Sequence, residues 1–451
     1  MAELSDLFVV LRSGPLPAAA LCERLGVSRP TLSRLVAAAG ERVLRYGRAR
    51  ATSYALPRTV ASQTRFPIFR IEADARVREI GRLEPVAPHG YLVSLTEHDA
   101  AEYFEGLPWW LQDMRPQGFL GRAFALREAG ALRLPADLRE WSDDDVLTAL
   151  ATTGDDWIGN LIVGDAALAR YLNGPQAEPL QAEDRPQGFP ILAAAALAGE
   201  LPGSSAGGEH PKFATQIEED GLIRPVLVKF SSAADNPVAR RWASLLVAEH
   251  LALQTLAAAG LPASRSTLFE FGGQVFLQVE RFDRVPAAAS ATNRPGRAGV
   301  VSLGALDSAF VGQANRPWPI ITAALLAQGH ITADAHRRTE RLWAFGRLIG
   351  NSDMHGGNLA FLHTGSAVLE LAPAYDMLPM TLAPRVSGEV PNVEPEVAIA
   401  APAPLDAWRE VLTLARDYWP RVAEDSRIEV SVRAIADRMS QRMAALAAQL
   451  G

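Results

Sequence analysis

Residues 350–358 read Gly-Asn-Ser-Asp-Met-His-Gly-Gly-Asn and lie between an apolar helical segment (LWAFGRLI) and a strand-like segment (LAFL). Asn358 follows Asp353 by five positions. A further acid, Asp376, comes 18 positions after Asn358 and follows a second strand-like segment (VLEL). These side chains supply carboxylate and amide oxygens on two neighbouring loops, and such oxygens are the ligands of a hard cation such as Mg²⁺. The pattern therefore predicts a magnesium site with Asn358 and Asp376 among its ligands.

The same spacing is typical of the catalytic loop of kinases, where the Asp takes or orients the proton of the attacked hydroxyl and the Asn binds Mg²⁺. We therefore assign Asp353, with His355 beside it, as the candidate catalytic group. His355 has three alternatives: it orients Asp353, it packs, or it joins Asp353 as a metal ligand. The structural alternative for Asp353 and Asn358 is a turn held by side-chain hydrogen bonds, and for Asp376 a helix N-cap.

Lysine usage singles out a second region. Lys212 and Lys229 are the only lysines, and the other 42 basic residues are arginines. A lysine in such a background indicates a site that needs a compact ammonium group. Lys229 ends an apolar strand-like segment (PVLVKF), and the helical segment that follows carries Glu249. A strand lysine paired with a helix glutamate positions the α- and β-phosphates of ATP in kinases, so we predict this pair here.

Two further segments fit a nucleotide site. Residues 202–213 form a small-residue loop in which Gly207 and Gly208 precede Lys212. Glycines let backbone N–H groups approach a phosphate closely, and a nearby lysine adds positive charge, although a plain flexible loop is the alternative. Residues 279–282 end a strand-like segment and are the candidate hinge that reads adenine through backbone groups.

The N-terminal residues have a different character. Residues 1–58 contain nine arginines and four acids, whereas the whole chain has a net charge of −7. Three short helical segments are predicted, with Ser28 as the N-cap of the third, at 4–12, 17–25 and 30–39. The alternating segment 43–56 around Gly47 is typical of a β-hairpin. This order resembles a winged helix-turn-helix domain.

A basic winged helix predicts contact with duplex DNA, because one end of an otherwise acidic chain carries the positive charge. The expected contacts come from the third helix and the tip of the hairpin, namely Arg29, Thr31, Ser33, Arg34, Arg48 and Arg50. The alternative is a winged helix used for protein docking or dimerisation.

The composition is that of an ordinary globular protein. The chain has 451 residues, of which 48% are hydrophobic and 21% charged, and its mean hydropathy is +0.03. This length corresponds to about three domains. The longest apolar run, 191–198, is too short to cross a membrane, and the N-terminus lacks the pattern of a secretory signal, so we expect a cytoplasmic location. The single cysteine, Cys22, excludes an intrachain disulfide and a multi-cysteine zinc site.

The motifs SSAGGEHPKF, VLVKF, VERFDR, NSDMHGGN and YDMLP occur in this order and together resemble the HipA family of bacterial serine/threonine kinases. The resemblance covers residues 200–385. It implies a two-lobed kinase-like fold, ATP and Mg²⁺ as cofactors, and a toxin that phosphorylates proteins of the translation apparatus. The added N-terminal winged helix resembles the subgroup called YjjJ, since the usual HipA toxin obtains DNA binding from a separate antitoxin.

The resemblance also implies roles for individual residues. Lys229 would hold phosphates, Asp353 would be the catalytic base, and Asn358 and Asp376 would bind magnesium. Glu280 and Phe282 would sit at the adenine hinge. The glycine-rich loop of the family contains a serine whose autophosphorylation inactivates the kinase, and the aligned residues are Ser204 and its neighbour Ser205. The loop departs from the family by one extra residue before Lys212, which affects the expected nucleotide contacts of Gly207, Gly208 and Lys212.

We therefore expect an α+β protein with a two-lobed, HipA-type kinase fold after a small winged helix-turn-helix domain. The expected domains are 1–58 for the winged helix, 66–285 for the N-terminal lobe with the loop 202–213, and 286–451 for a mainly helical C-terminal lobe. The expected partners are a protein substrate, DNA and a separate antitoxin, and no membrane. The alternatives are a DNA-binding regulator with an inactive, nucleotide-sensing kinase fold, a Mg²⁺-dependent nuclease and a small-molecule kinase.

Overall fold

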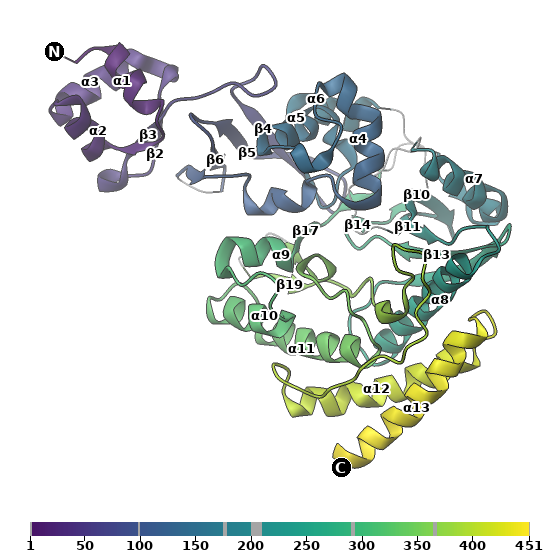
Figure 1. The fold of residues 1–451 in the computed structure, drawn as a ribbon. Coiled ribbons are helices and arrows are strands. Elements are labelled where there is room, and N and C mark those ends of the chain that lie inside the picture. Colours follow the sequence, from purple (N-terminus) through teal and green to yellow (C-terminus); the bar gives the residue numbers. More distant parts are fainter. Residues whose placement is uncertain are drawn as a thin grey trace.

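The computed structural model describes residues 2–97, 100–174, 178–199, 210–289, 294–363 and 368–450. Figure 1 shows a small N-terminal body at one end, a middle body beside it, and two further lobes that end in a pair of long C-terminal helices. Among the described residues, no helix is both long and apolar enough to cross a membrane.

The N-terminal domain has the predicted winged helix-turn-helix form. Gly26 ends the second helix in the left-handed conformation with φ 62°, and the Ser28 side chain accepts a hydrogen bond from the Thr31 amide at the start of the third. The helices are α1 (Leu4–Leu11), α2 (Ala18–Leu25) and α3 (Arg29–Ala39). The sheet has the order β1-β3-β2, with β1 (Leu16–Pro17), β2 (Leu44–Tyr46) and β3 (Ser53–Ala55).

The middle domain is built on a five-stranded antiparallel sheet of order β7-β6-β5-β4-β8. Its own core includes Phe66, Leu83 and Trp157. The strands are β4 (Phe66–Ile71), β5 (Val77–Pro85), β6 (Tyr91–Leu95), β7 (Glu102–Phe104) and β8 (Leu161–Val163). The helices are α4 (Gly118–Leu132), α5 (Asp143–Thr153) and α6 (Asp165–Asn173). The range 66–285, expected as one lobe, therefore contains two sheets with separate cores.

The second sheet is the N-terminal lobe of the kinase-like part, with the order β12-β13-β11-β10-β9 and β15 beside β11. Because neighbouring side chains on a strand point to opposite faces, Phe276 packs toward α7 and Leu277 toward α8. The strands are β9 (Leu180–Gln181), β10 (Lys212–Glu219), β11 (Leu222–Phe230), β12 (Ser266–Phe271), β13 (Gln274–Glu280) and β15 (Ala287–Ala288). The helices are α7 (Arg185–Leu197) and α8 (Pro237–Ala258).

The C-terminal lobe is mainly helical, as expected. Its helices share one large core with α8, and α12 lies against both α8 and α11 (Figure 1). The helices are α9 (Leu303–Leu306), α10 (Trp318–Ala327), α11 (Ala333–Leu348), α12 (Leu405–Glu424) and α13 (Val430–Leu450). The strands are β14 (Arg284–Val285), β16 (Gly296–Arg297), β17 (Gly299–Ser302), β18 (Ala360–His363) and β19 (Glu370–Leu371).

Candidate active site

Lys229 and Glu249 form a buried ion pair between β11 and α8. The Lys229 Nζ atom donates to Glu249 Oε1 at 2.6 Å and to Oε2 at 2.7 Å. Lys229 is 6% exposed and Glu249 is 1% exposed. The structure therefore brings together the strand lysine and the helix glutamate that the sequence singled out.

Asp376 completes this cluster from the loop after β19, because its carboxylate also accepts from Lys229 Nζ. Its backbone is left-handed, with φ 52°, and the Asn351 side chain donates to its carbonyl oxygen at 3.2 Å. Although burial alone would raise the pKa of Asp376, Lys229 lowers this pKa to about 2. Burial raises the pKa of Glu249 against the attraction of the same ammonium. One ammonium group is thus shared by two carboxylates.

The predicted catalytic loop lies between α11 and β18. Asn358 Nδ2 donates to the Asp353 carbonyl oxygen at 2.7 Å, and the Asp353 amide donates to Asn351 Oδ1 at 3.0 Å. The Asp353 side chain remains 53% exposed. His355 Nε2 lies 3.9 Å from Asp353 Oδ1, and its Nδ1 atom accepts from the Gly357 amide at 3.0 Å. The backbone is therefore held by the turn contacts while the Asp353 carboxylate stays open.

Tyr375 connects this loop to the other candidate residues. Its hydroxyl donates to the Gly357 carbonyl oxygen at 2.6 Å. On its other side, the ring centroid of Tyr375 lies 5.6 Å from that of Phe282, the predicted hinge residue. Tyr375 is not among the predicted site residues, although it directly precedes Asp376 in the YDMLP motif.

Glu280 lies at the end of β13, where the hinge was predicted. Its carboxylate is 3.6 Å from Arg224 and 3.9 Å from Arg265, so the side chain is part of ion pairs. The Glu280 amide donates to the Arg265 carbonyl oxygen at 2.9 Å, and the Arg281 amide to the Pro225 carbonyl oxygen at 3.1 Å. An adenine base would therefore be read by other backbone groups of this segment.

The glycine-rich loop is only partly within the described residues. Ser204, Ser205, Gly207 and Gly208 lie outside them, whereas Lys212 is 2% exposed and lies directly opposite Lys229.

Sequence reasoning missed His210 at the end of this loop. Its ring centroid is 4.7 Å from that of Trp242. Its two ring nitrogens are buried without a hydrogen-bond partner among the residues that the structure describes. Burial, assisted by Lys229 and Lys212, lowers the pKa of His210 to about 3. An uncharged imidazole therefore stands beside the charged cluster.

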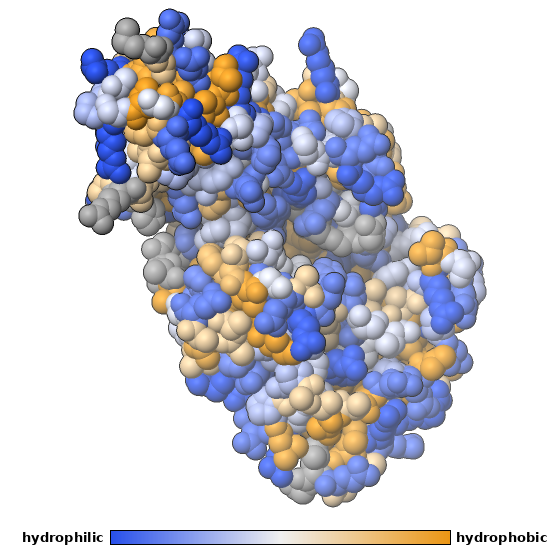
Figure 2. Space-filling view, turned by 60° about the vertical axis from the view of Figure 1, so that its left-hand side comes forward, coloured by the Kyte–Doolittle hydropathy of each residue, from blue (hydrophilic) through white to orange (hydrophobic). Residues whose placement is uncertain are grey.

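The helix α3 and the hairpin β2–β3, which carry the predicted DNA-binding residues, belong to the N-terminal body, away from β11 and α8 (Figure 1). Arg29, Ser33 and Arg34 are exposed on α3, and the Thr31 hydroxyl accepts from Arg34 at 3.3 Å. Figure 2 shows hydrophilic side chains on the outer edge of this domain, around a patch of hydrophobic ones.

The hairpin tip of the same domain has a different environment. Arg48 lines a pocket of about 340 Å³ together with Glu102 and Trp110 of the middle domain. Arg50 lies in the short turn Ala49–Ala51, and its side chain is outside the described part. The structure thus separates the exposed arginines of α3 from Arg48 at a domain boundary.

The predicted metal site would draw on an amide and a carboxylate side chain, Asn358 and Asp376. In the described ranges, no group of three or more His, Cys, Asp or Glu side chains is arranged to hold a metal ion. Asn358 uses its amide nitrogen on Asp353, which leaves its carbonyl oxygen as the ligand atom. Together with the Asp376 carboxylate, this set fits Mg²⁺, a cation that keeps several waters and is completed by substrate phosphates.

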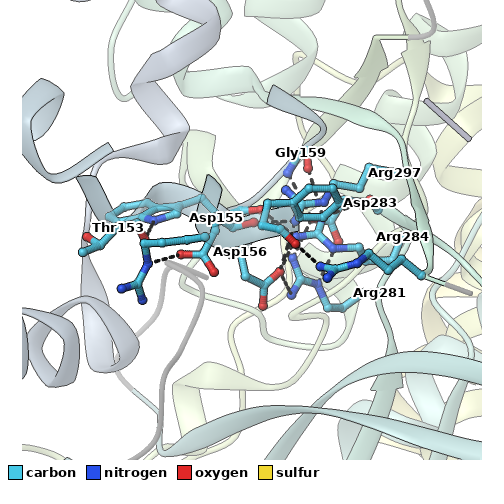
Figure 3. Close-up of polar contacts among 12 residues, drawn as sticks. Thr153, Asp155, Asp156, Gly159, Arg281, Asp283, Arg284 and Arg297 are labelled. Atoms are coloured by element: carbon cyan, nitrogen blue, oxygen red, sulfur yellow. Dashed lines mark hydrogen bonds and ion pairs between the residues drawn. The ribbon is translucent and has the colours of Figure 1, made fainter. Parts of the chain in front are cut away.

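A further cluster, which was not predicted, lies beside the predicted hinge. Arg281, Asp283 and Arg284 of the VERFDR motif contact Asp156 and Gly159 of the middle domain (Figure 3). From the sequence, this motif predicts only the hinge. No sequence signal connects it to Asp156, which is 128 positions from Arg284.

Known proteins and protein families match almost the whole chain. Residues 204–447 match the HipA-like C-terminal domain, and residues 62–172 match the middle domain of YjjJ-like toxins. Toxin YjjJ of Escherichia coli (strain K12) is 38% identical over 444 residues, which is 98% of this chain and 97% of that protein.

One solved structure agrees with the fold. HipA of Shewanella oneidensis MR-1, from a complex with HipB and operator DNA, is similar with a TM-score of 0.54 and 16% identity, covering 84% of this chain and 97% of that one. The proinflammatory kinase CtkA of Helicobacter pylori has a TM-score of 0.36 and 12% identity, covering 54% of this chain and 92% of that one.

Proposed function

The chain belongs to the YjjJ-like toxins of the HipA-like kinase family, and from this premise we propose that it is an ATP-dependent protein serine/threonine kinase. The observation that carries the proposal is the buried cluster in which Lys229 joins Glu249 and Asp376. In kinases, a strand lysine paired with a helix glutamate positions nucleotide phosphates, and a loop aspartate binds Mg²⁺.

The exposed Asp353 carboxylate is the proposed base. It would accept the proton of a substrate hydroxyl as that oxygen attacks the γ-phosphorus of ATP, and the bond to the β-phosphate oxygen would break to release ADP. His355, 3.9 Å away, would help to orient this carboxylate. The turn contacts to Asn351 and Asn358 keep the loop backbone fixed during the transfer.

ATP and Mg²⁺ are the proposed cofactors. Asn358 and Asp376 would hold the metal ion, which neutralises charge on the phosphates when it is bound. Lys229 has three donor hydrogens, and its contacts reach Glu249 twice and Asp376 once. At least one of these contacts would have to open for a phosphate oxygen to bind, and the contact with Asp376 is the natural one because Asp376 gains the metal.

The proposed substrate, self-phosphorylation site and partners rest on the resemblance to the family and on the positive charge of the N-terminal domain. By resemblance, the substrate is a protein of the translation machinery, and Ser204 or Ser205 is a site of self-phosphorylation. The exposed arginines Arg29 and Arg34 favour DNA as the partner of the N-terminal domain, with a separate antitoxin as a further partner.

The test is mass spectrometry of the purified protein after incubation with Mg-ATP, for the wild type and for Asp353→Asn. We expect phosphoserine in the segment with Ser204 and Ser205 in the wild type only. Asp406→Asn is the matched control, because it changes an 88% exposed aspartate on α12.

The alternatives give different results. Wild-type protein that starts unmodified, binds ATP and gains no phosphate on itself or on added proteins contradicts the proposal and supports a DNA-binding regulator. Cleavage of plasmid without ATP, lost in Asp376→Ala, would instead establish a nuclease.

A further inference from the structure

Three arginines and two aspartates form an ionic cluster where the middle domain meets the segment after β13 (Figure 3). Arg281 donates to both carboxylate oxygens of Asp283, at 3.0 and 2.8 Å. The Arg281, Asp283, Arg284 and Arg297 side chains are at most 10% exposed, whereas that of Asp156 is 59% exposed. Asp156 therefore lies at the solvent-exposed edge of the cluster.

Arg284 makes several of the hydrogen bonds that cross the domain boundary. Its Nη2 atom donates to Asp156 Oδ1 and to the Trp157 carbonyl oxygen, both at 2.7 Å. Its Nη1 atom donates to the Gly159 carbonyl oxygen at 2.9 Å and to Asp283 Oδ2 at 2.7 Å. The Gly159 amide donates in return to Asp283 Oδ2 at 3.0 Å. The middle domain thus holds the side chains that flank the hinge with directed hydrogen bonds.

The charge balance makes Asp156 necessary to this arrangement. Three guanidinium groups face two carboxylates, so the cluster already has an excess of positive charge. Burial and the neighbouring Arg284 lower the pKa of Arg297 to about 10, and its Nη1 atom has no hydrogen-bond partner within the described part. Without the charge of Asp156, Asp283 would be the one carboxylate of the cluster left to Arg281 and Arg284. Repulsion among the three guanidinium groups would then displace Arg281 and Arg284.

The displaced residues adjoin the candidate nucleotide site. Arg281 and Asp283 flank Phe282, whose ring centroid lies 5.6 Å from that of Tyr375. Tyr375 in turn precedes Asp376 and donates to the catalytic loop. A shift of segment 281–284 would therefore move the wall against which an adenine base would lie.

We infer that Asp156 of the middle domain is a positioning residue for nucleotide binding, which fixes the hinge by holding Arg281 and Arg284. The inference rests on the proposed function, because it requires ATP to bind beside residues 280–282. The middle domain would then help to position the nucleotide site, although none of its residues belongs to the Lys229 cluster.

The test compares full-length variants by isothermal titration with a Mg²⁺-bound, non-hydrolysable ATP analogue. In Asp156→Asn, we expect the Kd to rise about fivefold, and the KM for ATP to rise with little change in kcat. Asp155→Asn is the matched control, because the Asp155 side chain accepts from Arg170 at 3.0 Å inside the middle domain and only its carbonyl oxygen meets Arg297. Asp156→Glu should restore most of the affinity, since it keeps the charge at an exposed position.

Each outcome decides the inference. A Kd for Asp156→Asn equal to that of the wild type overturns it, and so does an equal rise in Asp155→Asn, which would indicate general loosening of the middle domain. Failure of Asp156→Glu to restore affinity also overturns it. If the wild type itself binds no ATP analogue, the proposed function fails and the inference falls with it, and the wild-type titration alone reveals this.

Discussion

Lys212 and Lys229 face each other as a residue pair across the antiparallel strands β10 and β11. They are the only lysines of the chain, and they are 2% and 6% exposed. Directly opposed side chains lie on the same face of a sheet, so two ammonium groups share one buried region. Glu249 and Asp376 offset part of this repulsion. The arrangement places both ammonium groups where the phosphates of a nucleotide would bind.

Lys229→Met should be strongly destabilising, because it leaves Glu249 and Asp376 buried without their shared counter-charge. Breaking a buried ion pair costs about 3 kcal/mol in free energy of unfolding, which urea titration would measure. The double variant Lys229→Met/Glu249→Gln should lose less than the sum of the two single variants, with a coupling of about 1 kcal/mol or more. Additive losses would contradict a direct interaction between the two side chains.

Asn358→Ala should raise the Mg²⁺ concentration needed for half-maximal kinase activity by about tenfold, because it removes a proposed oxygen ligand and the hydrogen bond to Asp353. Asn358→Asp keeps an oxygen ligand and loses only that hydrogen bond, so it should need less Mg²⁺ than the alanine variant. Magnesium titrations of phosphate transfer would compare the three proteins. An unchanged requirement in Asn358→Ala would remove Asn358 from the metal site.

The parts of the structure that sequence could predict are those with local signals. Ser28 and Gly26 mark the helix-turn-helix, because capping and left-handed turns depend on neighbouring residues. The pair of Lys229 and Glu249 was also predictable, because a strand that ends in lysine and is followed by a helix with a glutamate is the order found in kinases. The family motifs then supplied the two-lobed arrangement.

Contacts between residues far apart in the sequence could not be predicted in this way. The sheet of the middle domain could not be separated from that of the N-terminal lobe, because short antiparallel strands do not specify their partners. Asp156 gave no signal, since one aspartate among many acids does not indicate which of 42 arginines it meets. Tyr375 was missed because its contact with Gly357 depends on how two loops fold together.

Arg58 should stabilise the contact between the N-terminal domain and the middle domain. Its guanidinium group forms a two-pronged ion pair with Asp144, which also accepts from the Tyr91 hydroxyl at 2.6 Å. Arg58→Ala would leave Asp144 with one partner fewer, so we expect the free energy of unfolding to fall by about 2 kcal/mol. We also expect limited proteolysis between residues 57 and 65 to become faster. Arg76→Ala is the control, because that side chain is 82% exposed and pairs with exposed Asp74. Equal cleavage rates in both variants would contradict this role.

Two histidines with lowered pKa values should make the stability depend on pH. Burial lowers the pKa of His210 to about 3 and that of His250 to about 4, whereas the pKa of an unfolded histidine is about 6.5. As pH falls below this unfolded value, the unfolded chain binds protons that the folded chain refuses, so folding stability is complete above the unfolded pKa and declines in acid.

His210→Gln should reduce this acid sensitivity, because glutamine takes up no proton in either state. Between about pH 7.5 and about pH 5, the linkage of His210 amounts to about 2 kcal/mol, so the variant should lose that much less stability over this interval than the wild type. The linkage of His250 remains in both proteins and cancels in the comparison. His89→Gln, which changes an exposed histidine, should retain the full decline. Urea titrations at the two pH values measure the difference, and parallel declines in all three proteins would show that His210 is not kept neutral by the fold.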